Sequence, residues 1–252
     1  MRPVSGVPDV PVRTALVLAA GNGDRFRTGR RQSKLLEPIL GQPLILRTLR
    51  TARDAGITRA ELVLGYEADR LRRVIGRHVP DGLEVHFSYN TEWRLENGVS
   101  VLTARERLRV AHFALLMGDH LFHAPMLTRL LREPIEAGES ALAIDSRPAP
   151  PAVAEEATRV RLSGSRIVAI GKDLEVYDAL DTGVFVCAPP LFDALVESRE
   201  AGDTTLSGGI RRLAARGLMR GVDVGDVVWH DIDTRADLEA AAALFGRRAR
   251  SA

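Results

Sequence analysis

Short apolar runs alternate with amphipathic helical segments along roughly the first 145 residues of the chain. The runs are nearly uninterrupted, as in Phe113-Ala114-Leu115-Leu116-Met117, which is typical of strands buried on both faces. Strands are predicted at Thr14–Ala20, Glu61–Tyr66, Val85–Tyr89, His112–Met117 and Ala141–Ile144, and helices at Pro43–Gly56, Ala68–His78, Val99–Leu108 and around Met126–Leu131. This order predicts a parallel sheet with helices on both faces.

The pattern changes after a proline-rich segment at Arg147–Val153. Polar and apolar residues then alternate on both sides of a Ser163-Gly164-Ser165 turn, which predicts an antiparallel hairpin over Thr158–Ile170. Further elements are predicted as strand Thr182–Cys187, helices Leu191–Glu200 and Ile210–Arg216, strand Val227–Ile232, and a last helix Thr234–Phe245 capped by Thr234. We expect the second half to extend the same sheet, giving an α/β fold with a Rossmann-like, mostly parallel mixed sheet.

Composition excludes several classes of protein. The 252 residues suffice for one large domain, and the net charge of +2, with Arg scattered among Asp and Glu, gives no support for nucleic-acid binding. The single cysteine, Cys187, excludes an intramolecular disulfide and a Cys-rich metal site, and suits the cytoplasm. No apolar run approaches membrane-spanning length, and the proline-containing N-terminus is no signal peptide, so we expect no membrane insertion.

The first predicted strand leads directly into the loop Leu18-Ala19-Ala20-Gly21-Asn22-Gly23-Asp24-Arg25, with Lys34 shortly after. Glycines let backbone amides approach an anion closely, and Arg and Lys add positive charge, so the loop predicts a triphosphate site. Phe26 stands where a dinucleotide fingerprint needs its third glycine, which argues against a dehydrogenase, and no Gly-Lys-Ser/Thr follows for a Walker loop. The alternative is that the two glycines only form a tight turn.

Aspartates follow two of the predicted strands. Asp119 comes after a buried run, and Asp231 and Asp233 end the last predicted strand. In a strand the last two share one face, and carboxylates beside a triphosphate are the ligands that Mg²⁺ uses. Helix capping is the alternative for Asp119 and Asp233. His120 and His123 are interpreted as ordinary polar neighbours, because no third ligand of a His-x-x-His metal site is evident.

At this point the chain resembles a known family. The loop Leu18–Lys34, the turn Met117–His120 and the segment Asp231–Thr234 are similar to the nucleoside-triphosphate sugar nucleotidyltransferases, over nearly the whole chain. Further segments resemble the CTP:inositol-1-phosphate cytidylyltransferase branch, namely Glu96–Ser100, Glu156–Val160, Ile170–Leu174 and Asp178–Gly183. In that branch the domain is often fused to a membrane phosphatidyltransferase-like domain, which this sequence lacks, so we expect a stand-alone enzyme.

The resemblance implies roles for individual residues. Arg25 and Lys34 would be catalytic, and the nucleotide would lie on Leu18, Ala19, Ala20, Gly21, Gly23, Asn97, Gly98 and Ser100. Asp119 would bind Mg²⁺ with Asp233, or with Asp231 close by. Glu156, Lys172, Asp181 and Thr182 would line the acceptor pocket, although Lys172 as a solvent lysine and Asp181 as a turn acid are alternatives. A single domain of the nucleotidyltransferase type A fold is then expected over residues 13–247, with a nucleotide-binding part (13–120), an acceptor-binding part (121–247), a disordered tail at 1–12 and a tail at 248–252.

The implied reaction is cytidylyl transfer from CTP to a small phosphorylated polyol, inositol 1-phosphate above all. Because a phosphate monoester is already anionic, no general base is required, and positioning with charge neutralisation would carry the reaction. Phosphocholine or a hexose 1-phosphate is the alternative acceptor, and a non-catalytic nucleotide-binding regulator is the alternative of another class. The oligomeric state is left open, with a homodimer as one option.

Overall fold

The computed structural model describes residues 11–26, 33–149 and 155–248 of the chain. Nearly all of the predicted N-terminal and C-terminal tails, and most of the proline-rich segment, therefore lie outside the described residues. Within the described part, no helix combines the length and the apolar character that crossing a membrane requires. The division of the chain into a nucleotide-binding and an acceptor-binding part stays a prediction, although both parts contribute strands to one sheet.

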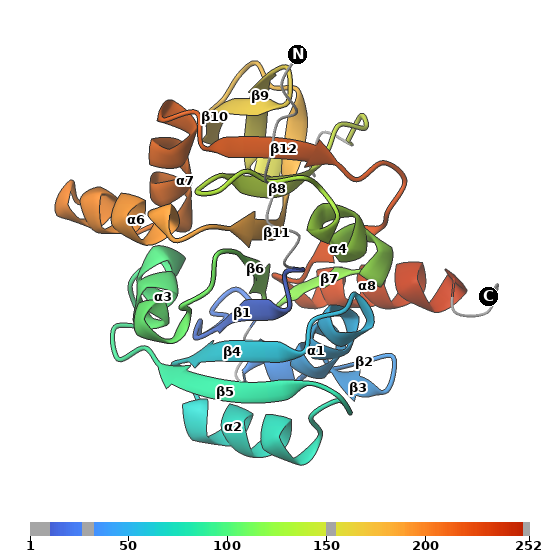
Figure 1. Cartoon of the computed structure of the whole chain (residues 1–252). Coiled ribbons are helices and arrows are strands. Elements are labelled where there is room, and N and C mark those ends of the chain that lie inside the picture. Colours follow the sequence, from blue (N-terminus) through green and yellow to red (C-terminus); the bar gives the residue numbers. More distant parts are fainter. Residues whose placement is uncertain (1–10, 27–32, 150–154, 249–252) are drawn as a thin grey trace.

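A nine-stranded sheet forms the centre of the molecule, in the order β5-β4-β1-β6-β11-β8-β12-β10-β9 (Figure 1). Its strands are β1 (Thr14–Ala19), β4 (Arg59–Leu64), β5 (Glu84–Tyr89), β6 (Phe113–Met117), β8 (Ser140–Asp145), β9 (Arg159–Ser163), β10 (Arg166–Gly171), β11 (Ala179–Cys187) and β12 (Met219–Asp223). The strands β5, β4, β1 and β6 pair in parallel, and the pairings show that only β10 and β11 run against the other strands. The predicted mostly parallel mixed sheet is confirmed.

Helices cover both faces, as predicted. On one face lie α1 (Leu44–Asp54), α2 (Ala68–Arg77), α4 (Ala124–Leu131) and α8 (Arg235–Arg248), and on the other α3 (Asn97–Thr103), α6 (Pro190–Glu200) and α7 (Leu206–Ala215). Successive residues of β1 alternate between the two cores, because Ala15 and Val17 pack on the first face and Leu16 on the second. Each fully buried leucine of this kind contributes about 1.5–3 kcal/mol, which explains why strand and helix positions are so clearly patterned.

Several elements differ from the prediction. The segment Val227–Ile232 does not join the central sheet: its strand β13 (Trp229–Asp231) forms a separate two-stranded ribbon with β7 (His120–Phe122). The strand β12 was not predicted, because Arg220, Gly221 and Asp223 are poor strand formers, and pairing with β8 and β10 decides its conformation.

Other boundaries shift because of local turns. A two-stranded hairpin of β2 (Pro38–Ile39) and β3 (Gln42–Pro43) precedes α1 around Leu40 and Gly41, which both have positive φ. The helix α3 ends earlier than predicted and a 3₁₀ turn, Arg105–Arg107, follows it. The helix α7 begins four residues earlier, because Thr205 caps it by accepting a hydrogen bond from the Gly208 amide.

Strand β11 bends in its middle. Its pairing register with β8 shifts between Asp181 and Phe185, and Gly183 between them has φ +74°. The later half pairs with β6, and the first residues also pair with β9. This bend turns the backbone beside the carboxyl end of β6, where the functional residues gather.

Candidate active site

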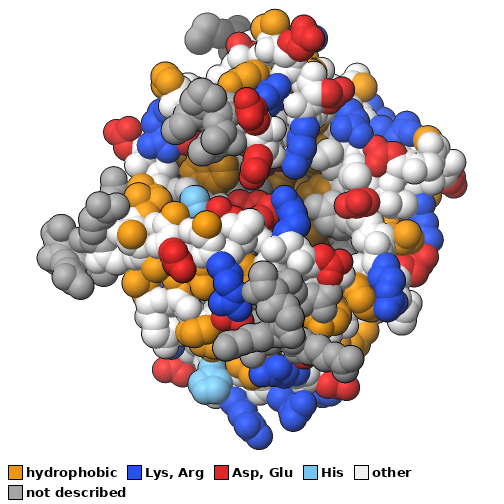
Figure 2. All heavy atoms as spheres, turned by 180° about the vertical axis from the view of Figure 1, so that it is seen from behind, with side chains coloured by type: hydrophobic (Ala, Val, Ile, Leu, Met, Phe, Trp, Pro, Cys, Tyr) orange, Lys and Arg blue, Asp and Glu red, His pale blue; other side chains and the backbone are white. Residues whose placement is uncertain are grey.

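Two adjoining cavities open where the strands β1 and β6 end. The first has a volume of about 680 Å³ and the second about 910 Å³. Both are lined by Arg25, Asn97, Met117, Asp119 and Asp233, so they meet at these residues. From the opposite side to Figure 1, the surface is hollowed and acidic, basic and histidine side chains lie together in the hollow (Figure 2).

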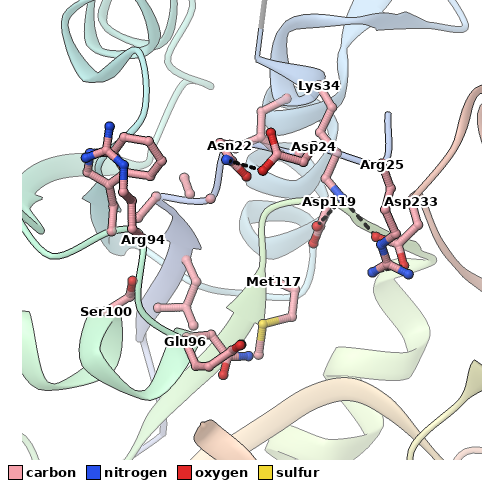
Figure 3. Close-up of a pocket in the computed structure, with 18 of the residues that line it drawn as sticks. Asn22, Asp24, Arg25, Lys34, Arg94, Glu96, Ser100, Met117, Asp119 and Asp233 are labelled. Atoms are coloured by element: carbon pink, nitrogen blue, oxygen red, sulfur yellow. Dashed lines mark hydrogen bonds and ion pairs between the residues drawn. The ribbon is translucent and has the colours of Figure 1, made fainter. Parts of the chain in front are cut away.

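Lys34 lines the first cavity and contacts two of the residues that both cavities share. Its Nζ atom lies 2.8 Å from Asp119 Oδ2 and 3.2 Å from Asp233 Oδ1, and it donates to the Ile232 carbonyl at 2.7 Å. Arg25 adds a second cation, with its Nη2 atom 2.7 Å from Asp233 Oδ2. Figure 3 shows these charged side chains together at one end of the first cavity. The structure thus brings together the cations of the glycine-rich loop and the aspartates from the middle and the end of the chain.

The two cations differ in their surroundings. The Lys34 side chain is only 10% exposed, whereas that of Arg25 is 67% exposed. Burial by itself would lower the pKa of Lys34, but Asp119, with help from Asp233 and Asp231, outweighs it and raises that pKa. Lys34 therefore remains protonated, and its charge is held in a site from which much of the water is excluded.

Two glycines, Gly23 and Gly118, allow backbone and side chains to lie close together at this site. Gly23 has φ +61°, and a Cβ atom there would lie 3.1 Å from the Lys34 side chain. Gly118 donates to the Leu18 carbonyl at 2.9 Å, and a Cβ there would lie 2.8 Å from the same oxygen. Leu18, Ala19, Ala20 and Gly21 line the first cavity together with Gly23. Gly21 has open space around its Cα atom, so no protein atom nearby requires a glycine there.

The last helix is capped without the functional aspartates. Thr234 Oγ1 accepts from the Asp237 amide at 3.2 Å, and Asp237 Oδ2 accepts from the Thr234 amide at 2.6 Å. Thr234 is thus the predicted N-cap, and Asp237 is the acid of this capping arrangement. Asp233 therefore does not cap this helix, and the Asp233 carboxylate faces Lys34 and Arg25 instead. Asp119 precedes strand β7 rather than a helix, so it caps none either.

His120 links the acids to the bent strand. Its Nδ1 atom lies 3.0 Å from the Thr182 carbonyl and its Nε2 atom 3.3 Å from Asp231 Oδ1. Burial would lower the pKa of His120, but Asp231, Asp119 and the Thr182 carbonyl outweigh it and raise that pKa to about 10. A Cβ atom on Gly183 would lie 2.2 Å from the His120 ring, so only glycine fits there. The interpretation of His120 as an ordinary neighbour is therefore wrong, whereas His123 packs its ring on Phe245.

The acids form a candidate site for a divalent cation. Ligand atoms of Asp119, His120 and Asp231 all lie within 4.8 Å of one another. Burial would raise the pKa of Asp231, but His120, with Lys34 and Arg25, lowers it well below its usual range, so this carboxylate is ionised. Its Oδ1 atom forms the ion pair with His120 Nε2 at 3.3 Å and accepts no further hydrogen bond within the described part of the chain. An ionised carboxylate with one ion-pair partner, beside a second carboxylate, fits a hard cation.

Of the three residues predicted to face the base, two line the first cavity and one does not. Asn97 and Ser100 line the first cavity, and Ser100 Oγ accepts from Asn90 Nδ2 at 3.0 Å. Gly98 does not line it. A Cβ on Gly98 would lie 2.6 Å from the Thr204 carbonyl, to which the Gly98 amide donates at 3.1 Å. This glycine is therefore needed for close packing of α3 on the loop before α7, which corrects its predicted role.

Three of the four predicted acceptor residues line the second cavity: Glu156, Lys172 and Asp181. Thr182 does not, because its side chain is fully buried and donates to the Ala143 carbonyl at 2.7 Å. It supports the cavity wall from behind. Burial raises the pKa of Asp181 to about 6, against the opposing effects of the Gly183 amide and of His120.

Sequence reasoning also missed part of the first cavity. Trp93, Arg94 and Glu96 line it, and the Arg94 guanidinium lies 4.2 Å from the Trp93 ring centroid. Arg94 and Ser100 lie at the end of the cavity away from Lys34 (Figure 3). The place of this segment in the chain could have indicated it, because it follows Asn90 at the carboxyl end of β5, and ligands of open α/β sheets bind at such strand ends.

Comparison with known proteins agrees with this geometry. Residues 15–165 match the MobA-like NTP transferase domain. The chain is 37% identical over 229 residues to the "Bifunctional IPC transferase and DIPP synthase" of Rubrobacter xylanophilus, covering 89% of this chain and 50% of that protein. It is 30% identical to the protein of the same name from Aquifex aeolicus, over 91% of this chain and 51% of that protein. The chain thus spans about half the length of these curated relatives.

A solved structure extends the likeness to three dimensions. The "inositol-1-phosphate CTP transferase from T. maritima" superposes with a TM-score of 0.78 and 27% identity, over 90% of this chain and 91% of that one. The predicted nucleotidyltransferase fold is thereby confirmed. The residues matched by the family model include the glycine-rich loop, Lys34 and Asp119. The chain therefore belongs to the family of MobA-like NTP transferase domains.

Proposed function

We propose that this protein transfers the cytidylyl group of CTP to a small phosphorylated polyol, with inositol 1-phosphate as the first candidate, and releases pyrophosphate. The observation that carries the proposal is the junction of two cavities at Arg25, Asp119 and Asp233, where Lys34 contacts both acids from the first cavity. A transferase that joins two substrates needs two adjoining pockets with the charged groups between them. The names of the T. maritima structure and of the Rubrobacter relative support this pair of substrates.

The first cavity suits the nucleotide. Gly21 and Gly23 of the loop line this cavity together with Arg25 and Lys34, and a glycine-rich backbone beside two cations is suited to a triphosphate. With phosphate present, Lys34 would exchange part of its contact with Asp119 and Asp233 for contact with the α-phosphate. Because the ammonium is already desolvated and protonated, its interaction with charge that develops on the phosphate is strong.

The acids at the junction suit Mg²⁺. Asp119 would hold the ion with Asp233 or Asp231, and the closeness of ligand atoms of Asp119 and Asp231, within 4.8 Å of each other, supports the second arrangement. A bound Mg²⁺ supplies neutralisation of charge on the phosphate oxygens. Arg25 contributes to the same end, because its guanidinium is mostly exposed and can reach a ligand as well as Asp233.

The second cavity suits a phosphorylated polyol. The acceptor phosphate oxygen would form a bond to the α-phosphorus as the bond to the pyrophosphate oxygen breaks, with no proton to remove from the attacking group. Lys172 would bind the acceptor phosphate, and Asp181 and Glu156 would accept hydrogen bonds from hydroxyl groups. Phe185 and Trp229 are the only aromatic residues among the described residues that line this cavity, which disfavours a quaternary ammonium such as phosphocholine.

Pyrophosphate release tests the proposal directly. The purified chain is incubated with Mg²⁺, each of the four common nucleoside triphosphates, and inositol 1-phosphate, glycerol 3-phosphate, glucose 1-phosphate or phosphocholine. We expect release only when CTP and a phosphorylated polyol are both present, fastest with inositol 1-phosphate. Pyrophosphate release with glucose 1-phosphate and another nucleotide would show that the proposed substrates are wrong. Nucleotide binding without any pyrophosphate release would favour a non-catalytic regulator. A cytoplasmic location and a homodimer stay predictions.

A further inference from the structure

The turn between β4 and α2, residues Gly65-Tyr66-Glu67, contacts one end of the glycine-rich loop. The Tyr66 amide donates to the Ala20 carbonyl at 2.9 Å. A Cβ on Gly65 would lie 2.8 Å from the same carbonyl and 2.4 Å from Trp93 Cβ, so the turn packs tightly against both. None of its three residues is among those that line the first cavity in the described part of the chain. The turn therefore braces the start of the loop from behind.

The same turn holds the other end of the loop. Glu67 Oε2 accepts a hydrogen bond of 2.6 Å from the Ser33 amide, which lies 34 positions earlier in the chain. Ser33 is fully buried, and the Glu67 side chain is only 20% exposed. A hydrogen bond from a buried amide to a carboxylate is charge-assisted and short, so it is among the stronger anchors that a loop can have.

Ser33 transmits this anchor to Lys34. The Ser33 hydroxyl accepts from the Leu35 amide at 3.4 Å, and Ser33 is the N-cap of the 3₁₀ turn Lys34–Leu36. The direction in which the Lys34 side chain leaves the backbone depends on this turn. Its Nζ atom then reaches Asp119, Asp233 and the Ile232 carbonyl at 2.7–3.2 Å.

The backbone of Glu67 is in an unfavourable conformation. Its φ of 50° and ψ of 32° lie in the left-handed region, which residues other than glycine, asparagine and aspartate rarely adopt. Leu40, in a tight turn before Gly41, is the other such residue among the described residues. Strain of this kind persists where the surrounding contacts over-determine the conformation. At Glu67 the carboxylate contacts the Ser33 amide and, at 3.6 Å, Arg70 Nη1, and the carbonyl accepts from the Arg70 and Leu71 amides.

We infer that Glu67 is a positioning residue, whose carboxylate holds Ser33 so that Lys34 is directed at the junction of the two cavities. Its effect on catalysis rests on the proposed function. Loss of the carboxylate frees the segment from residue 33 to residue 36, and a displacement of about 1 Å of a catalytic group can cost up to about 100-fold in rate. The expected loss in Glu67→Ala is therefore about 10- to 100-fold in kcat.

The test compares Glu67→Ala with Glu67→Gln, whose amide oxygen can still accept from Ser33, and with Glu67→Asp, which keeps the charge but shortens the reach. The matched control is Asp69→Ala, which removes an acid from the first turn of α2 without touching Ser33. Hydrogen exchange of the full chain, followed by mass spectrometry, should show faster exchange over residues 33–36 in Glu67→Ala. Wild-type exchange is expected in Asp69→Ala, whereas Glu67→Gln, with a neutral acceptor, and Glu67→Asp, with a shorter reach, should lie between the wild type and Glu67→Ala. Unchanged exchange in Glu67→Ala would overturn the inference.

Kinetic measurements then test whether Glu67 acts through Lys34. With CTP and the acceptor saturating, Glu67→Gln should recover at least a third of the wild-type kcat, and the acceptor KM should change little in any variant. In a Lys34→Ala background, Glu67→Ala should cost less than twofold. An equal cost in both backgrounds would show a merely structural role and contradict the inference. If the wild type releases no pyrophosphate, the proposed function fails, whereas the exchange measurement still decides whether Glu67 anchors Ser33.

Discussion

The two cavities are built in different ways. The first lies at the carboxyl ends of parallel strands, and its charged side chains come from loops that follow β1, β5 and β6, with Asp233 added from the segment after β13. The second is formed by the antiparallel, bent strand β11, the end of β8 and the ribbon of β7 and β13. A parallel edge orients loops and backbone amides toward one point and so makes an anion site readily, whereas the second cavity depends on a bend and on a strand outside the main sheet.

The residues that line the cavities differ in charge as well. Among the described residues, seven acids line the second cavity, against the cations Arg25, Arg147 and Lys172. Four acids line the first, against the cations Arg25, Lys34 and Arg94, so the second cavity is the more acidic. If the first cavity serves phosphate chemistry and the second serves recognition of hydroxyl groups, changes in the first should lower kcat with every acceptor. Changes confined to the second should raise the KM of the acceptor and leave the affinity for CTP unaltered.

The largest effect is expected for Lys34→Ala. Removing one preorganised, desolvated charge from a transition state costs about 3–4 kcal/mol, which corresponds to a fall of roughly 10²–10³-fold in kcat. Steady-state pyrophosphate release with saturating CTP, Mg²⁺ and acceptor measures it. Lys172→Ala, in the second cavity, serves as the comparison and should act mainly on the acceptor KM. Near-normal turnover of Lys34→Ala would remove the basis for assigning catalysis to the junction.

The bend between the two regions can be tested through Gly183. Gly183→Ala introduces a Cβ atom 2.2 Å from the His120 ring at a residue with φ +74°, and should lower the free energy of unfolding by about 2–3 kcal/mol. Thermal or urea unfolding measures the change. Gly164→Ala is the matched control, because its φ is +61° but no atom lies within 4 Å of its new Cβ. It should lose about 1 kcal/mol, from the backbone alone. Equal losses would contradict a steric role of Gly183.

The ion pair between β7 and β13 predicts a dependence of stability on pH. Because the folded-state pKa of His120 is raised from 6.5 to about 10, its stabilising effect is complete below pH 6.5 and is lost as the pH rises through about 10. In His120→Gln the free energy of unfolding should fall less steeply between pH 7 and pH 10 than in the wild type. His78→Gln is the control for replacing a histidine at an exposed position. If His120→Gln kept the wild-type slope, the assignment of a positive charge to His120 in the folded protein would be wrong.

The smallest effect is expected for Asp181, in the second cavity. Asp181→Asn should raise the acceptor KM by about tenfold, equivalent to about 1.4 kcal/mol, and leave the KM for CTP unchanged. Because the pKa of Asp181 is raised to about 6, the acceptor KM of the wild type should fall as the pH rises through 6 and the carboxylate becomes ionised. The part of this dependence due to Asp181 should be lost in Asp181→Asn, whereas the part due to the second ionisation of the acceptor phosphate, with a pKa of about 6, should remain. A change in the KM for CTP would show that the two cavities are not separate in function.

The first half of the molecule could be predicted closely because its strands are continuous and apolar. Strand β6 ends at Met117 and Asp119 follows, so the position of this acid at the sheet edge was readable from the chain. The second half was harder, because β12 contains Arg220, Gly221 and Asp223 and lacks an apolar pattern. Its conformation depends on β8 and β10, which are distant in the sequence.

The residues of the candidate site likewise fall into those that a local pattern could predict and those that depend on tertiary contacts. Arg25, Lys34 and the three aspartates were identified by position and residue type. The correction of Gly98 needed the packing of α3 on the Thr204 backbone, and the correction of Thr182 needed the bend in β11. His120 was misjudged for a related reason: its partners, Asp231 and the Thr182 carbonyl, come from segments more than 60 residues away.

By itself, the sequence determined the alternation of buried strands and amphipathic helices, and with it a loop of glycines and cations at the end of the first strand, since such patterns are local. Only the tertiary structure decided that Lys34 lies between Asp119 and Asp233, that Gly183 makes room for His120, and that Glu67 holds Ser33. These contacts join segments distant along the chain, and their geometry is set by packing, which no local pattern encodes.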